Sequence, residues 1–275
     1  MSTFAVHMAA KCSLVISTYN WPQALKLCLD SVLRQSVLPG EVIIADDGSG
    51  EETKKLIQLY QSASPVRIVH VWHADKGFRK SIILNKAIQQ TSSDYIIQVD
   101  GDVILNRHFI ADHLTTREPE AFVRGTRAML SPHKTAGLMA SGDGAAGLSA
   151  LSAGVQHRFN GLRLALLSGL VVRKKMSSNS VRGSNLAYWK ADFVSINGYN
   201  NALQGWGHED EELAARLINL GIVKKIVKLK AVQFHLYHDE GHRQTADNHR
   251  AEIERIKEHK IIACENGYLQ AADYE

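Results

Sequence analysis

The chain has 275 residues, the size of one ordinary α/β domain or two small ones. Hydrophobic residues make up 45% and charged residues 22% of it, with 20 Gly and 5 Pro, which excludes wholesale disorder, collagen-like repeats and a disulfide scaffold. The formal net charge of +4 is too small and dispersed to indicate a nucleic-acid partner. We therefore expect one globular domain that does not bind nucleic acid.

The cysteines and the apolar stretches bear on the cellular compartment. Cys12, Cys28 and Cys264 are odd in number and show no paired spacing, so we expect free thiols in a reducing environment. The first ten residues lack a signal-peptide pattern, and the longest apolar stretch, 162–172, falls far short of the roughly 20 residues that span a bilayer. We expect a cytoplasmic protein, and the basic run at 173–175 is compatible with peripheral attachment to the inner face of the membrane.

Strand and helix patterns alternate in the first hundred residues. Apolar, β-branched runs predict buried strands at 12–17, 41–45, 66–72 and 95–99. Apolar residues at three- and four-residue spacing predict helices after Pro22, at about 51–61 and at 77–90. This alternation favours an α/β fold with a parallel sheet and right-handed crossovers. Ligands bind such sheets beyond the carboxyl ends of the strands.

The pattern loosens after residue 125. Residues 136–154 are rich in Gly, Ala and Ser, which predicts a mobile, substrate-facing segment. The later elements expected from apolar spacing are a helix at 155–170, a helix at 209–220 that stops at Gly221, one or two strands at 224–232 and a helix around 253–256.

A pair of acids, Asp100-Gly101-Asp102, follows the fourth predicted strand. Residues two apart on an extended segment point to the same side, and Gly101 lets a ligand approach the backbone, so the two carboxylates are expected to converge. Carboxylate oxygens suit Mg²⁺ or Mn²⁺, which would also bind the phosphates of a substrate. A solvated turn is the alternative for so short a motif.

Two more polar segments follow predicted strands: Ser17-Thr18-Tyr19-Asn20 and Asp46-Asp47-Gly48-Ser49. Together with the Asp-X-Asp at 100–102, they resemble the inverting family-two glycosyltransferases. This resemblance implies the GT-A, or nucleotide-diphospho-sugar transferase, fold, in which helices flank a mostly parallel central sheet.

The resemblance also implies a set of donor and metal residues. Those implied for the nucleotide or donor sugar are Ser17, Tyr19, Asp47, Lys76, Arg79, Asp100 and Asn185. Those implied for Mn²⁺ or Mg²⁺ are Asp102, Asp100, His235 and His238. We favour His235, with His238 second. The two histidines do not share one face of a strand, so only one of them is expected to bind the metal. The alternatives are solvated charges at 76 and 79, a turn residue at 185 and histidines that merely donate to carbonyl groups.

A third motif, Gly205-Trp206-Gly207-His208-Glu209-Asp210, opens the predicted helix at 209. Acids in a first helical turn are stabilised by the helix dipole, so a capping signal is the alternative, but capping does not explain Trp206. The segment resembles the Trp-Gly-X-Glu-Asp motif of glycosyltransferases with a galactosyltransferase-like second half, including chondroitin-type polymerases. That resemblance implies acceptor contacts for Trp206 and Glu209 and the catalytic base for Asp210. His208 stands where such relatives often carry glycine.

We therefore expect a single GT-A domain over 1–275, with a nucleotide-sugar-binding half at about 11–105, an acceptor half at about 106–240 and a helical tail at about 241–275. The expected activity is metal-dependent, inverting transfer of a hexose from a nucleotide sugar, with UDP favoured as the carrier. The expected acceptor is a glycan or lipid-linked glycan such as lipopolysaccharide, lipooligosaccharide or capsule. One rival is a nucleotide-sugar-binding subunit without turnover. A dinucleotide-dependent oxidoreductase is the other, and the first strand lacks its Gly-X-Gly-X-X-Gly.

Overall fold

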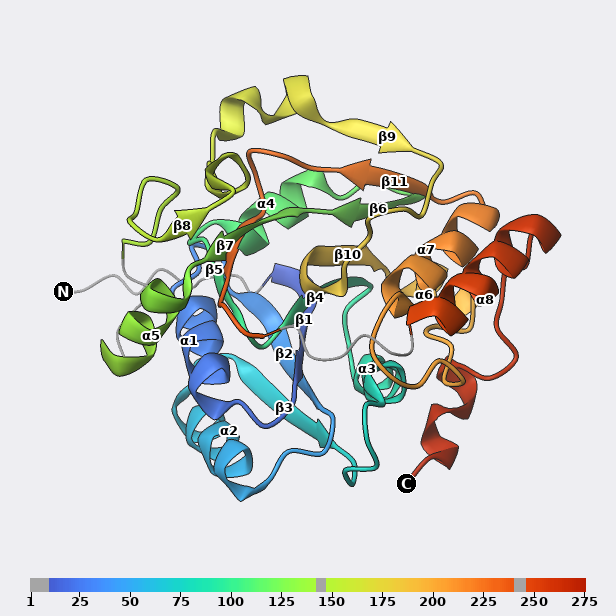
Figure 1. Cartoon of the computed structure of the whole chain (residues 1–275), viewed down its shortest axis with the longest axis horizontal. Helices are drawn as coiled ribbons and strands as arrows, with labels where there is room; N and C mark the ends of the chain where they lie inside the picture. Colours follow the sequence, from blue (N-terminus) through green and yellow to red (C-terminus); the bar gives the residue numbers. More distant parts are fainter. Residues whose placement is uncertain (1–9, 142–146, 240–245) are drawn as a thin grey trace.

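The computed structural model describes residues 10–141, 147–239 and 246–275, and within these it contains two sheets surrounded by helices (Figure 1). The strands of the larger sheet are, in spatial order, β3 (Arg67–Trp72), β2 (Pro39–Asp46), β1 (Ala10–Thr18), β4 (Tyr95–Asp100), β10 (Leu186–Trp189), β6 (Ala121–Arg124), β11 (Val223–Ile226) and β9 (Arg173–Lys175). The strands of the smaller sheet are, in order, β5 (Val103–Leu105), β12 (Val232–His235), β7 (Thr126–Leu130) and β8 (Val155–Gln156).

Helices cover the sheets and connect their strands. The α-helices are α1 (Pro22–Leu33), α2 (Glu51–Ala63), α3 (Lys80–Gln89), α4 (Phe109–Thr116), α5 (Pro132–Ser141), α6 (Lys190–Ser195), α7 (Glu209–Asn219) and α8 (Ala246–His259). The 3₁₀ helices are η1 (Arg158–Gly161), η2 (Ala165–Val171), η3 (Gly183–Asn185) and η4 (Tyr268–Asp273).

The first four strands, β1 to β4, pair in parallel as the sequence predicts. Their side chains alternate between the two faces of the sheet: Leu14 and Ile16 pack with α1 and α2, whereas Val15 packs with α3 and α7. Both faces are therefore buried, which is why these strands are continuous apolar runs rather than alternating ones. The antiparallel strand β10 then separates β4 from β6. The result is the expected mostly parallel central sheet flanked by helices.

The second half of the chain differs from the prediction in one segment. Residues 155–170 form β8, η1 and η2 rather than an α-helix. Glycine is costly in a helix interior, by about 1 kcal/mol relative to alanine, and Gly161 and Gly169 interrupt this stretch. The segment 136–154 was predicted to be mobile, and its residues 136–141 lie in α5. Residues 142–146 of the segment lie outside the described residues.

The other late elements are confirmed. Helix α7 ends as predicted before Gly221, whose φ of 98° is the left-handed conformation that favours glycine. Strands β11 and β12 occupy the predicted 224–232 region and its edge, and α8 buries Ile253 and Ile256. In the described part of the chain, every helix is too short or too polar to cross a bilayer. The division into donor half, acceptor half and tail stays a prediction.

Candidate active site

The segments after β1 and β3 meet at the carboxyl edge of the larger sheet. Ser17 is paired with Asp100 in the register of β1 and β4, and its hydroxyl donates to Asp100 Oδ1 over 2.8 Å. The hydroxyl of the half-exposed Tyr19 donates to Asp75 Oδ2 over 2.9 Å, which joins the segment after β1 to the segment after β3. Polar side chains from separate strands therefore gather where a ligand is expected.

Asp47 is buried at the same edge, and both of its carboxylate oxygens have partners. Oδ1 lies 2.6 Å from His73 Nε2, and Oδ2 accepts the backbone N–H of Arg79 over 2.9 Å. The Arg79 guanidinium donates to the carbonyls of Ala74 and Glu275. With Lys76, Arg79 lines a surface hollow of about 460 Å³. The contacts of these residues with a nucleotide stay predictions.

Lys80, the first residue of α3, joins the two acidic motifs. Its ammonium lies 2.8 Å from Asp100 Oδ1 and 3.7 Å from Glu209 Oε1. Asp100 ends β4, whereas Glu209 begins α7, more than a hundred residues later. Asp100, expected to serve the donor, and Glu209, expected to contact the acceptor, thus share one cation.

The charges of this cluster act on one another strongly because the groups are buried. Burial and the neighbouring Asp210 raise the pKa of Glu209 to about 7, although Lys80 opposes both. Burial alone would also raise the pKa of Asp100, but Lys80, the Ser17 hydroxyl and His235 together outweigh burial and lower it. For Lys80, burial is outweighed by the surrounding carboxylates, which raise its pKa.

Glycine is required at position 101 for a different reason from the expected approach of a ligand to the backbone. A Cβ at this position would lie 3.1 Å from the Ser17 carbonyl oxygen and 3.2 Å from Thr18 Oγ1. The backbone N–H of Gly101 also donates to the Ser17 carbonyl over 2.7 Å. The end of β1, rather than a ligand, therefore occupies the space that glycine leaves open.

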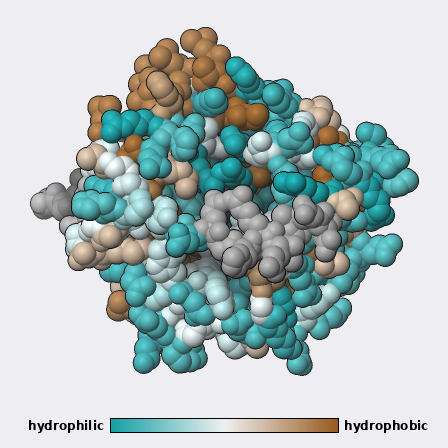
Figure 2. Space-filling view, viewed as in Figure 1, coloured by the Kyte–Doolittle hydropathy of each residue, from teal (hydrophilic) through white to brown (hydrophobic). Residues whose placement is uncertain are grey.

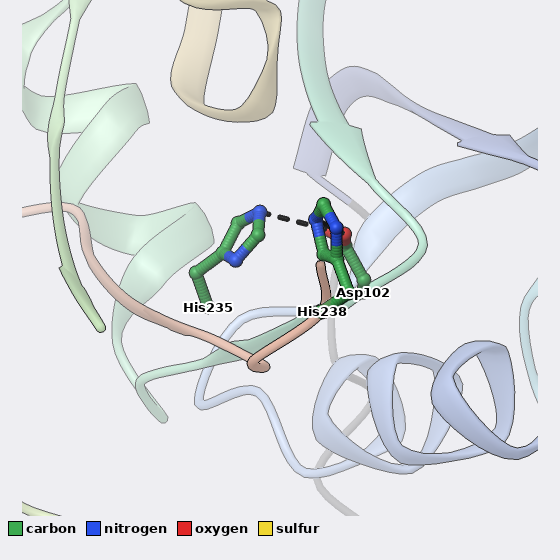
Figure 3. A group of neighbouring side chains, drawn as sticks. All are labelled: Asp102, His235 and His238. Atoms are coloured by element: carbon green, nitrogen blue, oxygen red, sulfur yellow. Dashed lines mark ion pairs between the residues drawn. The ribbon is translucent and has the colours of Figure 1, made fainter. Parts of the chain in front are cut away.

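Asp102, His235 and His238 form a compact group, with one ligand atom from each within 4.8 Å of the others (Figure 3). Asp102 Oδ2 lies 3.4 Å from His235 Nε2 and 3.2 Å from His238 Nε2. Strand β12 ends at His235, so the chain can turn and bring His238 to the same side. Both histidines face the carboxylate because the strand ends at His235, and the binding of a metal by only one of them stays a prediction.

The hydrogen bonds behind this group suit a divalent cation. Nδ1 of His235 lies 2.7 Å from the Leu236 carbonyl, and Nδ1 of His238 lies 3.1 Å from the Asp239 carbonyl. A carbonyl only accepts, so each Nδ1 carries a proton, and the Nε2 that faces Asp102 is the ring atom that a metal would bind. Asp102 Oδ1 is buried and has no hydrogen-bond partner among the described residues. Two imidazole nitrogens and a carboxylate are suitable ligands for Mn²⁺.

Asp210 is fixed by two hydrogen bonds. Its Oδ2 accepts the backbone N–H of Gly183 over 2.6 Å, and its Oδ1 accepts the hydroxyl of Tyr199 over 2.9 Å. Behind Tyr199, the buried amide of Gln98 contacts both the Tyr199 and the Tyr188 hydroxyl over 2.9 Å. The carboxylate is therefore held by a connected buried network while remaining partly exposed, as a general base requires.

The remaining predicted residues lie beside this network. Trp206 is 44% exposed, and its loop is attached to the first half of the chain because Gly205 donates its N–H to the Phe78 carbonyl. His208 has a φ of 64°, a conformation that favours glycine. The amide of Asn185 is buried and hydrogen-bonded to His113 and to the carbonyls of Thr126 and Ala231. A contact between Asn185 and the donor sugar stays a prediction.

Two cations near the acids were missed by the sequence reasoning. Lys80 follows Arg79 directly and is the first residue of α3. The helix dipole disfavours a cation at a helix N-terminus, so an unexplained cation there indicates a function, but this argument was applied to Lys76 and Arg79 and not to Lys80. Arg127 lies in β7, where burial alternates as in any half-buried strand. Burial and the nearby Arg182 lower the pKa of Arg127, while the charges of Asp100, Asp102 and Asp210 oppose that shift. Its Nε is buried without a hydrogen-bond partner among the described residues.

Both motif-bearing regions match known family models. Residues 13–123 match the model described as "Glycosyl transferase family 2", which covers β1 to β6. These residues are therefore similar to glycosyl transferase family 2. Residues 170–239 match the model "N-terminal domain of galactosyltransferase" and carry Asp210 and both histidines. The family-two resemblance and its galactosyltransferase-like second half are thus confirmed, and they support a glycosyltransferase.

Individual relatives agree with this family. The chain is 31% identical over 101 residues to hyaluronan synthase of Pasteurella multocida, which covers 36% of this chain and 10% of that protein. It is 26% identical over 220 residues to validoxylamine A glucosyltransferase of Streptomyces hygroscopicus subsp. limoneus, which covers 76% of this chain and 48% of that protein. The chain therefore spans at most about half the length of these two family relatives.

Solved structures show the fold. GalNAc-T7, solved with UDP, GalNAc and Mn²⁺, superposes with a TM-score of 0.63 at 15% identity, covering 88% of this chain and 47% of that one. The predicted GT-A fold is confirmed.

Proposed function

We propose that this chain is a metal-dependent, inverting glycosyltransferase that moves a hexose from a nucleotide sugar, with UDP as the favoured carrier, to a hydroxyl group of a glycan. The observation that carries the proposal is the position of Lys80 between Asp100 and Glu209. It supports a single site in which the donor motif and the acceptor motif act together.

The donor end of the site combines an aromatic face with cations. Tyr19 and Asp47 are proposed to hold the nucleoside, and Lys80 and Arg127 are close to the acids that follow β4. When the nucleoside diphosphate departs, it gains negative charge, which these cations would stabilise. Structural relatives support this choice of donor, because GalNAc-T7 was solved with UDP.

Asp102, His235 and His238 are the proposed ligands of Mn²⁺ or Mg²⁺, with Asp100 beside them. When bound, such an ion supplies positive charge to the diphosphate oxygens. GalNAc-T7, solved with Mn²⁺, supports the use of a divalent cation.

Asp210 is the proposed base. It takes the proton of the acceptor hydroxyl, whose oxygen bonds to the anomeric carbon while the bond from that carbon to the diphosphate oxygen breaks with its electron pair. A single displacement of this kind inverts the anomeric centre. The Gly183 N–H and the Tyr199 hydroxyl keep the carboxylate oriented, and Trp206 and Glu209 are proposed to contact the acceptor.

The acceptor is proposed to be a growing or lipid-linked glycan, such as lipopolysaccharide, lipooligosaccharide or capsule, at the inner face of the cytoplasmic membrane. The match to hyaluronan synthase, whose name denotes a polysaccharide-forming enzyme, supports a glycan acceptor.

The proposal is tested by measuring UDP release from a panel of UDP-sugars with Mn²⁺ and glycan acceptors. Asp210→Asn should lower turnover by about 10²–10⁴-fold, the usual contribution of a general base, and leave UDP binding intact in a thermal-shift titration. Asp192→Asn is the matched control, because Asp192 also lies in the first turn of a helix. If Asp210→Asn keeps most of the turnover, the base assignment is wrong, and a wild-type chain that consumes none of the donors contradicts the proposed reaction.

A further inference from the structure

One segment outside the site carries a concentration of exposed apolar side chains. Sixteen large hydrophobic residues are exposed in the described part of the chain, and seven of these lie between residues 151 and 176. We call this segment the apolar ridge. Its exposed members are Leu151 (81%), Phe159 (89%), Leu164 (41%), Leu166 (99%), Leu167 (49%), Leu170 (84%) and Met176 (56%).

The ridge is concentrated at one end of the molecule. Figure 2 shows the hydrophobic atoms gathered at the top of the view, where η2 and β9 lie in Figure 1. Large exposed apolar patches on soluble folds mark surfaces that bind a partner, because exposing them to water is unfavourable. Leu166 and Leu170 contribute nothing to the core, so the fold gives no reason for leucine at either position.

The charged residues within the segment that carries the ridge all have one sign. Residues 147–176 contain five Lys or Arg and no Asp or Glu. Strand β9 pairs Lys174 with Lys225 and Lys175 with Lys224 across the edge of the larger sheet. Like charges opposite each other destabilise a strand pair. Glu118 contacts Lys174 and Lys225, whereas burial, Arg124 and Lys175 lower the pKa of Lys224, and Glu211 opposes them.

The ridge is attached firmly to the strands of the site. Arg163 donates two hydrogen bonds of 2.8 Å to the buried carboxylate of Asp112 in α4. Gly161 packs so closely that a Cβ there would lie 3.1 Å from Ala128 in β7 and from Phe234 in β12. These are the strands that carry Arg127 and His235. A surface that binds the ridge would therefore hold the proposed active site at a fixed orientation.

We propose that the apolar ridge and its cations dock this chain onto an anionic phospholipid bilayer. Exposed leucines and a phenylalanine beside a cluster of cations match the two parts of such a surface, its acyl region and its negative headgroups. Neither a second copy of the chain nor an acidic protein accounts for both features as directly. The docking does not depend on sugar transfer, so Asp210→Asn should bind vesicles as the wild type does.

The test is co-sedimentation of the full chain with vesicles of phosphatidylglycerol and phosphatidylethanolamine, compared with phosphatidylcholine alone. The wild type should bind the anionic vesicles at least tenfold more tightly, and 0.5 M NaCl should weaken binding, since salt screens the cations. Leu166→Gln/Leu170→Gln should weaken binding at least tenfold, and Arg173→Ala/Lys175→Ala should remove the preference for anionic lipid.

Leu59→Gln/Leu269→Gln is the matched control, because both leucines are more than 60% exposed on α2 and η4. This control should bind like the wild type, and circular dichroism should be the same for all variants. Three outcomes overturn the proposal: no binding to anionic vesicles, equal loss in the control, or a wild-type dimer in sedimentation velocity that the ridge variant converts to a monomer without any vesicle binding.

Discussion

The ammonium of Lys80 lies 2.8 Å from Asp100 Oδ1 and is almost buried. Removing one partner of a buried ion pair leaves the other charge uncompensated, at a cost of about 3–5 kcal/mol. Lys80→Met should therefore lower the free energy of unfolding by roughly 3 kcal/mol, measured by urea denaturation in a chelator so that no added cation replaces the ammonium. Lys76→Met, at an exposed position, should change it by less than about 0.5 kcal/mol. Equal stability of the two variants would show that the Lys80 pair contributes nothing.

Gly183 limits where the Asp210 carboxylate can be. A Cβ at position 183 would lie 2.5 Å from Asp210 Oδ1, so Gly183→Ala must displace the carboxylate. A misplacement of about 1 Å can reduce turnover 10²-fold, and we expect a loss of that order in kcat with little change in UDP binding. Gly137→Ala, where a Cβ meets nothing within 4 Å, is the control and should keep full activity. Full activity of Gly183→Ala would mean that the position of Asp210 is unimportant.

The metal group predicts a cation-dependent melting temperature. Mn²⁺ should raise the Tm of the wild type, because a ligand that binds only the folded state stabilises it. Asp102→Ala, His235→Ala and His238→Ala should each reduce or abolish this rise in differential scanning fluorimetry, whereas His259→Ala at the end of α8 should not. If both histidine variants respond to Mn²⁺ like the wild type, the proposed ligands are wrong.

His113 predicts loss of stability in acid. Burial lowers its pKa to about 4, and its Nε2–H donates to Asn185 Oδ1. The unfolded chain, with a histidine pKa near 6.5, binds the proton first, so stability falls as pH drops from about 6.5 to 4, by up to about 3 kcal/mol. Urea denaturation across this range should show a shallower slope for His113→Gln. Glu209, whose pKa is raised to about 7, takes up its proton in the same pH range, and this stabilises the folded state as the pH falls. Subtracting the His113→Gln profile from the wild-type profile removes the contribution of Glu209. Parallel slopes would contradict the prediction.

The order of β1 to β4 and their helices was predictable because apolar runs and spacings are local. The stretch at 155–170 was not, because its apolar residues were interpreted as a helix, whereas it forms β8, η1 and η2, and Leu166 and Leu170 face solvent. Hydrophobicity alone does not distinguish a core from a surface that binds a partner.

The candidate site was predictable where a motif carries it, as at Asp102 and Asp210. The Lys80 bridge and the second histidine were not, since both depend on chain geometry beyond the motif. Lys80 reaches Glu209 only because α3 and α7 cover the same face of the sheet, and His238 reaches Asp102 only because β12 ends at His235. No local pattern contains those relationships.

The pairing of Ser17 with Asp100 limits how this chain can change in length. Side chains in a strand alternate in direction, so an insertion or deletion of one residue inside β4 would turn Asp100 away from Lys80, and one inside β1 would turn Ser17 away from Asp100. Either change would also exchange the core-facing residues of that strand. The loop between α2 and β3 carries no such alternation. In a selection for folded, expressed protein, one-residue insertions and deletions should therefore be retained in the loop between α2 and β3 and lost from β1 and β4.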